Sequence, residues 1–260
     1  MIDGHVHLER GPLGRAYVKE FIEEAQRKGI NELQILDHTH RFREFRDMYE
    51  PMKKIPAQKE WLDHDFNDSI DDYLTLIREM KEMRLPIKVS FGLEVCFQIS
   101  YLPFLKDILK RYDFDFLVGS VHSINNIAYD SNWSIEELWK RFPVDYIYEK
   151  YFEESYALVR SGLFTQIGHP DTIKMWGLYP SFDVLPFYEK LAVLCKEYGV
   201  RPENNTGCYY RYHHPDMGLA EDVLKVFKKH GCDMITVSDA HVPEDVGNHI
   251  ADIYEITMGK

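Results

Sequence analysis

The sequence predicts an α/β fold, specifically a distorted (βα)7 TIM-like barrel formed by a single domain. Short apolar runs alternate with amphipathic segments of helical period along the whole chain, a pattern typical of parallel strands connected by helices. A His, Asp or Glu follows most of these runs, as Asp239 and His241 follow the run that begins at Met234. Because the strands of a parallel barrel all end at one face, these polar side chains are expected to gather there.

Seven segments are expected to form strands, and the one at residues 200–204 is the weakest of them. They cover residues 1–6, 32–36, 87–91, 116–118, 163–169, 200–204 and 234–237. The alternative is an open doubly wound sheet, which binds its ligand where the strand order reverses. The chain lacks the GxGxxG turn of that fold, and its polar strand ends are spread over the full length. A barrel is therefore favoured, and no Pro-, Gly- or Ser-rich linker divides it.

Helices are predicted wherever apolar residues recur at spacings of three and four. They cover residues 16–28, 69–83, 101–111, 145–160, 182–198, 219–229 and 246–257. A glycine lies just beyond four of them, where this residue commonly ends a helix. Ser134 and Glu137 have the spacing of a capping box, which predicts a further short helix.

The segment 41–67 interrupts this alternation. It is rich in charged and aromatic residues and shows no sustained period. Irregular insertions of this length are uncommon in compact domains unless they serve as binding loops or lids. We expect a lid over a compact ligand, with an ordinary surface loop as the alternative. In the first case its acidic residues, such as Glu44, Asp47 and Glu50, would receive a cationic amine.

Composition excludes several classes of protein. With 260 residues, 45% of them hydrophobic, the chain can bury a full core, and its net charge of −12 disfavours a nucleic-acid-binding surface. The four cysteines show no CxxC spacing, so neither a disulfide framework nor a thiolate metal site is predicted. No secretory signal and no apolar run of membrane-spanning length occurs. We expect a cytoplasmic protein without nucleic-acid or membrane partners, and the sequence carries no indication of its oligomeric state.

Eight side chains at the predicted strand ends form a candidate metal centre. They are His5, His7, His38, Glu94, His122, His169, Asp239 and His241. A single histidine is more often a hydrogen-bonded structural side chain than a ligand. Imidazoles and carboxylates that converge in a buried site, however, repel and desolvate one another unless divalent cations neutralise them. The recurrence of these residues at successive strand ends therefore indicates a metal-binding site.

Six short motifs occur in the order found in one known family. They are HVH at residues 5–7, DH at 37–38, GLE at 92–94, SVH at 120–122, GHPD at 168–171 and SDAH at 238–241. Together they resemble the polymerase and histidinol phosphatase (PHP) superfamily over nearly the whole chain, so one PHP-type domain over residues 1–260 is expected. The segment NTGCYYR at 205–211, followed by HPDMG, is similar to the histidinol-phosphate phosphatase branch.

The resemblance implies a centre of two to three divalent ions, zinc, manganese or iron. Carried over position by position, its ligands form three sets: His5, His7 and Asp239 for the first ion, His122 and His169 for the second, and His38 and His241 for the third. Glu94 would bridge the first two ions. The third site departs from the family, which commonly supplies another histidine where GPLG places Leu13. Because leucine cannot bind a metal, this site is expected to be weak, empty, or completed by Glu9 or His40, with Glu9 preferred.

The resemblance also implies hydrolysis of a small phosphorylated metabolite, with L-histidinol phosphate, an intermediate of histidine biosynthesis, as the first candidate. Two ions that share Glu94 would activate a water for attack on phosphorus, and Asp239 is the candidate to pass a proton to the leaving alcohol. An arginine is expected to bind the phosphoryl oxygens. Arg211 is the first candidate, and Arg15 or Arg10 the second.

Other functions stay open at this point. A PHP-type phosphodiesterase or exonuclease and a phosphotyrosine phosphatase are alternatives within the same superfamily. A non-catalytic metal-binding barrel is a third alternative, which the leucine at position 13 keeps open. A metal-dependent amidohydrolase shares the HxH motif and a late aspartate, but it usually bridges its metals with a carboxylated lysine, where this chain has Glu94.

Overall fold

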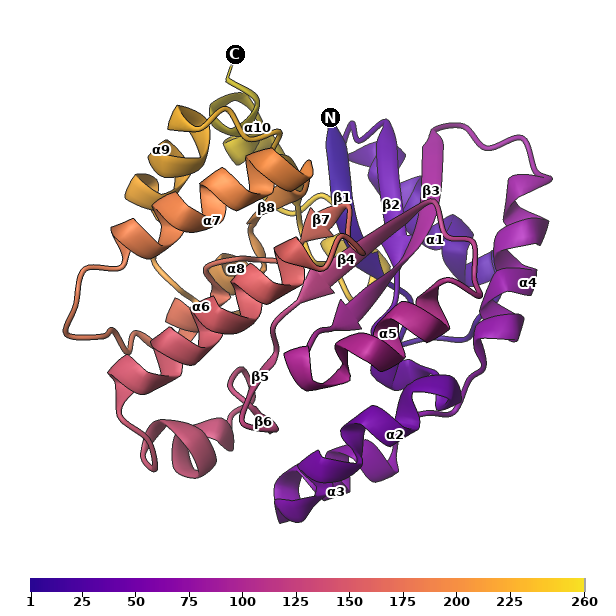
Figure 1. The fold of residues 1–260 in the computed structure, drawn as a ribbon. Coiled ribbons are helices and arrows are strands. Elements are labelled where there is room, and N and C mark those ends of the chain that lie inside the picture. Colours follow the sequence, from indigo (N-terminus) through magenta and orange to yellow (C-terminus); the bar gives the residue numbers. More distant parts are fainter. Residues whose placement is uncertain (260) are drawn as a thin grey trace.

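The computed structural model describes residues 1–259 and contains a seven-stranded parallel sheet that forms a nearly closed barrel (Figure 1). The strands are β1 (Ile2–His7), β2 (Glu32–Leu36), β3 (Lys88–Cys96), β4 (Phe116–Ser120), β7 (Gln166–Ile167), β8 (Arg201–Asn205) and β9 (Ile235–Val237). They lie side by side in chain order, and each neighbouring pair is parallel. The predicted distorted (βα)7 barrel is confirmed.

The barrel closes between its first and last strands. The backbone amide of His7 donates to the carbonyl oxygen of Ala240 over 2.7 Å. Near the other end of the same seam, the hydroxyl of Thr236 donates to the carbonyl oxygen of Ile2 over 2.6 Å. The seam therefore brings the first residues of the chain beside residues from its last quarter, which lie far apart in the sequence.

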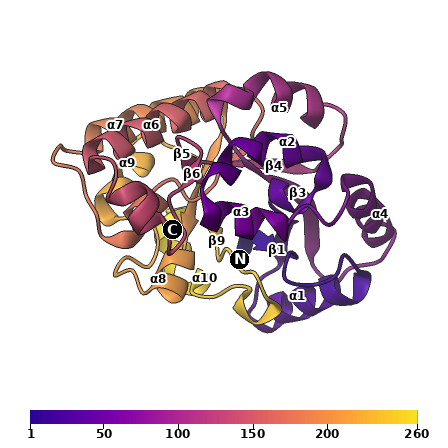
Figure 2. The same cartoon turned by 90° about the horizontal axis from the view of Figure 1, so that it is seen from below.

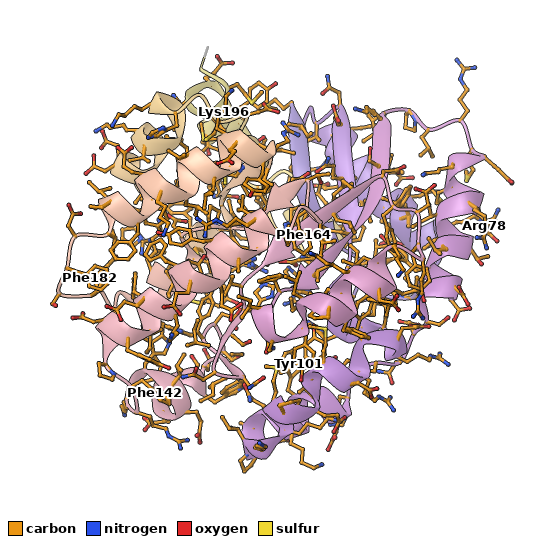
Figure 3. The ribbon with its side chains drawn as sticks, in the orientation of Figure 1. Arg78, Tyr101, Phe142, Phe164, Phe182 and Lys196 are labelled. Atoms are coloured by element: carbon orange, nitrogen blue, oxygen red, sulfur yellow. The ribbon has the colours of Figure 1, made fainter. Side chains whose placement is uncertain are left out.

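Helices surround the barrel, and each turns an apolar face toward it. They are α1 (Arg15–Arg27), α4 (Ile70–Lys81), α5 (Leu102–Leu109), α6 (Val144–Arg160), α7 (Leu185–Tyr198), α9 (Glu221–Lys229) and α10 (Ile250–Met258). In α1, apolar residues at helical spacing, such as Val18 and Phe21, are buried. Side chains fill the space between helices and strands, with Phe164 near the centre and Arg78 and Lys196 at the periphery (Figure 3). No helix within residues 1–259 is both long and apolar enough to cross a membrane.

Two strands, β3 and β7, differ most from their predicted extents. β3 extends to Cys96, well beyond its predicted end, because Gly92 continues the pairing with β4. A Cβ atom at this glycine would lie 2.6 Å from the ring of Phe116, so only glycine fits there. β7 is shorter than predicted and pairs over Gln166–Ile167 only, because the chain turns at His169, whose φ is 27°. Glu94 therefore lies within a strand, whereas His169 lies on a turn.

The predicted capping box is wrong. Ser134 makes no capping hydrogen bond with its side chain, and its hydroxyl donates instead to the carbonyl oxygen of Tyr129 over 2.8 Å. The segment that follows forms a short π-helix, Ile135–Trp139. The residue spacing alone did not reveal the competing backbone acceptor.

The predicted irregular insertion is ordered. Residues 41–67 form 3₁₀ turns and two short helices, α2 (Arg46–Tyr49) and α3 (Pro56–Asp63). The ring of Tyr49, at the end of α2, packs against that of Phe66, which follows α3, with centroids 5.3 Å apart. Each turn is too short to produce a periodic pattern in the sequence. Both helices lie with the hairpin of β5 (Ser123–Ile124) and β6 (Ile127–Ala128) at the end of the barrel opposite the N-terminus (Figures 1 and 2).

Candidate metal centre

The side chain of Glu94 occupies the middle of the candidate centre. β3 carries it into the barrel, where none of it is exposed to solvent. Its Oε2 atom lies 3.1 Å from Nε2 of His5 and 3.3 Å from Nε2 of His7. The Nε2 atom of His38 lies 2.8 Å from the same oxygen. One oxygen of this carboxylate is thus surrounded by imidazoles from β1 and from the end of β2.

The other oxygen of Glu94 faces a different pair of histidines. Oε1 lies 3.2 Å from Nε2 of His122 and 3.1 Å from Nε2 of His169. These two ring nitrogens are themselves 3.2 Å apart. The two oxygens of Glu94 therefore face separate sets of imidazole nitrogens. A carboxylate shared by two cations has this arrangement.

The first predicted ligand set, His5, His7 and Asp239, is brought together. One donor atom from each lies within 4.8 Å of the others. Asp239 reaches this site from a turn, since β9 ends at Val237 and Asp239 adopts a left-handed φ of 57°. Asp239 and His241 follow the strand, as the sequence predicts, and the turn directs both side chains to the candidate centre.

The third predicted pair, His38 and His241, lies around the carboxylate of Glu9. Oε2 of Glu9 is 2.7 Å from Nδ1 of His38, and Oε1 is 3.3 Å from Nε2 of His241. Together with His7, these residues form a second group whose donor atoms all lie within 4.8 Å. His38 also belongs to a group with Glu94 and His122, so its ring lies between the sites.

Leu13 and His40 lie outside these groups. Leu13 packs against the core and lines a groove on the outer side of Arg41. The ring of His40 stacks on His38 with centroids 4.6 Å apart, but its Nδ1 atom lies 3.2 Å from a carboxylate oxygen of Asp65. Of the two candidates to complete the third site, Glu9 belongs to the group with His38 and His241. His40 lies next to this group but is not part of it.

The donor atoms present fit divalent cations. Nε2 of His5 and Nε2 of His7 lie only 2.9 Å apart in a site with no solvent exposure. Two unprotonated ring nitrogens at this distance repel each other unless a cation or a proton lies between them. In addition, Nδ1 of His7 and Nδ1 of His169 are buried without a hydrogen-bond partner among the described residues.

The pKa shifts of Glu94 and His7 suit metal binding. For His5 and His38, burial lowers the pKa, but nearby carboxylates outweigh this effect and raise the pKa well above its usual value. Burial raises the pKa of Glu94, but His38 and His5 outweigh this effect and hold the pKa well below its usual value. For His7, burial together with His38 and His241 holds the pKa well below its usual value. An ionised carboxylate and a neutral imidazole are the forms that bind a divalent ion.

Of the three candidate arginines, Arg211 alone reaches the cluster. It lies on α8 (Gly207–Tyr212), and its Nη2 atom is 2.6 Å from Oδ2 of Asp239, while Nη1 is 2.6 Å from Nδ1 of His241. Burial lowers the pKa of Arg211, but Asp239 outweighs this effect and raises it. Arg15 is exposed and paired with a glutamate of α4. Arg10 is also exposed and lines another polar cavity, which Glu9 and His40 border as well.

A cavity of about 270 Å³ opens beside His38 and His122. The insertion forms one wall of it, through Tyr49, Met52 and Trp61. A smaller adjoining cavity of about 110 Å³ is lined by Arg211, and Asp130 borders both cavities. The insertion therefore covers one side of the candidate metal centre, as a binding loop would.

The acidic residues predicted to receive an amine do not line these cavities. The carboxylate of Glu44 accepts the backbone amide of Ile70 at the start of α4. Asp47 and Glu50 are exposed. The prediction is wrong because the buried face of these short helices is aromatic and their charged residues point outward. Asp130 is the acidic residue outside the cluster that borders both cavities.

Two residues in contact with the cluster are not singled out by the sequence. Glu203 accepts a hydrogen bond from Nδ1 of His5 over 2.9 Å. The thiol of Cys96 lies 3.2 Å from Nδ1 of His122. Burial raises the pKa of Cys96, but His122 outweighs this effect and lowers the pKa to about 7. For Glu203, the available signal in the sequence was a charged residue inside a predicted strand. Cys96 reaches the cluster because β3 extends as far as this residue.

The family assignment follows from comparison with known proteins. The PHP domain family matches residues 3–206, which include β1 to β8 and six of the eight predicted ligands at the strand ends. This chain belongs to the PHP domain family. The two later predicted ligands, Asp239 and His241, and also Arg211, lie beyond the segment that matches the PHP domain.

Two curated relatives match this PHP protein over nearly its whole length. A probable histidinol-phosphatase of Deinococcus radiodurans is 25% identical over 257 residues, which cover 97% of this chain and 90% of the relative. A probable histidinol-phosphatase of Schizosaccharomyces pombe is 24% identical over 274 residues, which cover 97% of this chain and 85% of the relative.

Solved structures show the same PHP fold. The histidinol phosphate phosphatase of Lactococcus lactis, in complex with zinc, L-histidinol and phosphate, aligns with a TM-score of 0.72 at 18% identity, over 98% of this chain and 92% of its own. A putative histidinol phosphatase of Listeria monocytogenes aligns with a TM-score of 0.65 at 17% identity, over 97% and 99%. The family and its named relatives assign the chain to the metal-dependent phosphatases, as the sequence predicts.

Proposed function

We propose that this PHP protein hydrolyses a small phosphate monoester and that L-histidinol phosphate is its preferred substrate. The observation that carries the proposal is the position of Glu94, whose two oxygens face separate sets of imidazoles beside a cavity. The names of the two curated relatives, and the L-histidinol and phosphate in the Lactococcus lactis structure, support this choice of substrate.

Two to three divalent ions are the proposed cofactors. When bound, such ions polarise phosphoryl oxygens and lower the pKa of water, which supplies a nucleophile at neutral pH. Glu94 would fix the separation of the first two sites through its two oxygens. Asp239 is held by Arg211 through Oδ2, so its Oδ1 atom is directed toward His7 at 3.4 Å.

Asp239 is proposed as a ligand and not as the proton donor to the leaving alcohol. Burial raises the pKa of Asp239, but Arg211 and His7 outweigh this effect and hold the pKa well below its usual value. A carboxylate that stays ionised at neutral pH has no proton to give to the leaving group.

Replacing Glu9 by alanine is expected to remove one divalent ion per chain. Glu9 supplies the carboxylate between His38 and His241, and without it the third site would keep only imidazoles. Elemental analysis of the purified variant measures the change. Leu13→His is the control and is expected to leave the metal content unchanged, because this side chain lies outside the cluster. Full metal content in Glu9→Ala would contradict the assignment.

A cationic amine on the substrate is proposed to bind at Asp130. This carboxylate borders both cavities, and the described part of the chain provides it with no ion pair. The aromatic rings of Tyr49 and Trp61 line the same space and suit the flat ring of a small substrate. A phosphate at the cluster, a ring on the aromatic wall and an amine at Asp130 would together fix one orientation.

Replacing Asp130 by asparagine is expected to raise KM for L-histidinol phosphate about tenfold, because the lost charge-assisted hydrogen bond contributes roughly 1.5 kcal/mol. KM for a simple aryl phosphate, which has no amine, should stay unchanged and serves as the internal control. Equal losses on both substrates would show that Asp130 acts on the cluster itself and not on the amine.

Steady-state kinetics on metal-loaded protein test the proposed function. L-histidinol phosphate is expected to give the highest kcat/KM in a panel with an aryl phosphate, a phosphotyrosine peptide and a short oligonucleotide. Preferential cleavage of the oligonucleotide would indicate a phosphodiesterase, and preference for the peptide would indicate a tyrosine phosphatase. Absence of turnover on every substrate, with the metal content verified, would leave a non-catalytic barrel.

A further inference from the structure

Glu203 is a fully buried carboxylate that contacts two candidate ligands from different parts of the barrel. It lies on β8, between β7 and β9, and none of it is exposed. Oε1 accepts from Nδ1 of His5 over 2.9 Å, and Oε2 accepts from the backbone amide of His169 over 2.9 Å. The amide of Gln166 also donates to Oε1, over 3.4 Å. All three partners of Glu203 are donors, so this side chain acts only as an acceptor.

The hydrogen bond to Glu203 determines which ring nitrogen of His5 carries the hydrogen. When Nδ1 donates its hydrogen to Glu203, the lone pair of a neutral imidazole is on Nε2. Nε2 is the atom that faces Glu94 and His7, at 3.1 and 2.9 Å. The bond therefore orients the ring and directs its free lone pair into the cluster.

The contact with His169 fixes a backbone segment. His169 has a φ of 27°, which is unusual for a residue with a side chain and is retained only where neighbouring groups hold it. The hydrogen bond from its amide to Glu203 anchors this turn, and the turn points Nε2 toward Oε1 of Glu94 at 3.1 Å. The carboxylate of Glu203 thus supports two histidines, His5 and His169, whose Nε2 atoms face the two different oxygens of Glu94.

We propose that Glu203 is a positioning residue that holds His5 and His169 in the geometry for metal binding and couples the two sites that share Glu94. The inference rests on the proposed metal centre and adds a residue that touches neither metal nor substrate. Outer carboxylates of this kind fix the tautomer of a ligating histidine and tighten metal binding.

Glu203→Gln tests the proposal with little change in size. The amide retains one acceptor oxygen, so it can satisfy His5 or His169 but presents a donor to the other. The dissociation constant for Zn²⁺, measured by competition with a chromophoric chelator, is expected to rise about ten- to a hundredfold. The rise in melting temperature on adding Zn²⁺ should be smaller in Glu203→Gln than in the wild type, which a purely structural role would not predict.

Asp171→Asn is the matched control, because Asp171 is a buried carboxylate whose bonds go to Ala220 and Lys174 and not to the cluster. Its Zn²⁺ affinity is expected to stay within about twofold of the wild type, well below the effect on a ligand-supporting residue. Unchanged Zn²⁺ affinity in Glu203→Gln would overturn the inference about Glu203 but not the proposed function. A wild-type protein that binds no Zn²⁺ would instead overturn the proposed function on which the inference rests.

A measurement on the unmodified chain covers the case in which Glu203→Gln fails to fold. In the Zn²⁺-loaded wild-type protein, long-range ¹H–¹⁵N spectra should show the ring hydrogen of His5 on Nδ1. A hydrogen on Nε2 would contradict the proposed role of Glu203.

Discussion

Replacing Glu94 by glutamine is expected to lower kcat/KM for a phosphate monoester about a thousandfold. Glutamine has nearly the same shape, but it lacks the negative charge and has one oxygen in place of two. The buried imidazoles on both sides of residue 94 would then lose their shared acceptor. Loss of a shared ligand removes several kcal/mol of transition-state stabilisation, and about 4 kcal/mol corresponds to about a thousandfold in rate.

Steady-state kinetics and elemental analysis on the same preparation check this result. Glu154→Gln is the matched control, since Glu154 lies on α6 and its carboxylate accepts the backbone amide of Ile99, away from the cluster. His122→Ala should resemble Glu94→Gln, because His122 faces the same carboxylate at 3.2 Å. Wild-type turnover after exhaustive chelation, or in Glu94→Gln, would contradict a mechanism that depends on shared metals.

The fold could be predicted because its determinants are local. Most strands contain a short apolar run and each barrel helix has an apolar stripe, so their order along the chain specifies alternating strands and helices. β8, with the sequence RPENN, is the exception among the strands. The ends of elements were less predictable. Gly92 resembles a strand terminus in the sequence, but in the barrel it allows close contact with Phe116 and the strand continues. The helices of segment 41–67 are too short to leave a period.

The candidate ligands could be predicted because they follow apolar runs at the ends of parallel strands, where the fold gathers them. Their supporting residues could not. Glu203 lies within a strand, and its partner His5 is far away in the sequence, so only the closed barrel brings them together. Asp239 illustrates a second limit, since the left-handed turn that directs it to the cluster has no signature in the motif SDAH.

Arg211 is the other residue whose removal should have a large effect. It is the cation nearest to Asp239, and its two terminal nitrogens contact two candidate ligands at 2.6 Å each. The guanidinium also lines the smaller cavity with His122 and His169, so a phosphoryl group placed there would meet it. Its position serves two roles, because it holds Asp239 in place and adds positive charge where the phosphate is expected.

Replacing Arg211 by alanine is expected to lower kcat/KM for L-histidinol phosphate about a hundredfold, mostly through KM. A hydrogen bond between charged groups contributes roughly 1.5 to 3 kcal/mol, and about 3 kcal/mol corresponds to this loss. Arg211→Lys should recover only part of it, because an ammonium group cannot reproduce the planar fork that contacts both Asp239 and His241. The changes in KM, kcat and bound metal, measured on the same variant, distinguish the two roles of Arg211.

A rise in KM at full metal content indicates that Arg211 contacts the phosphate. A loss of metal indicates that the guanidinium mainly holds the ligands. Unchanged kinetics and metal content would show that Arg211 has neither role.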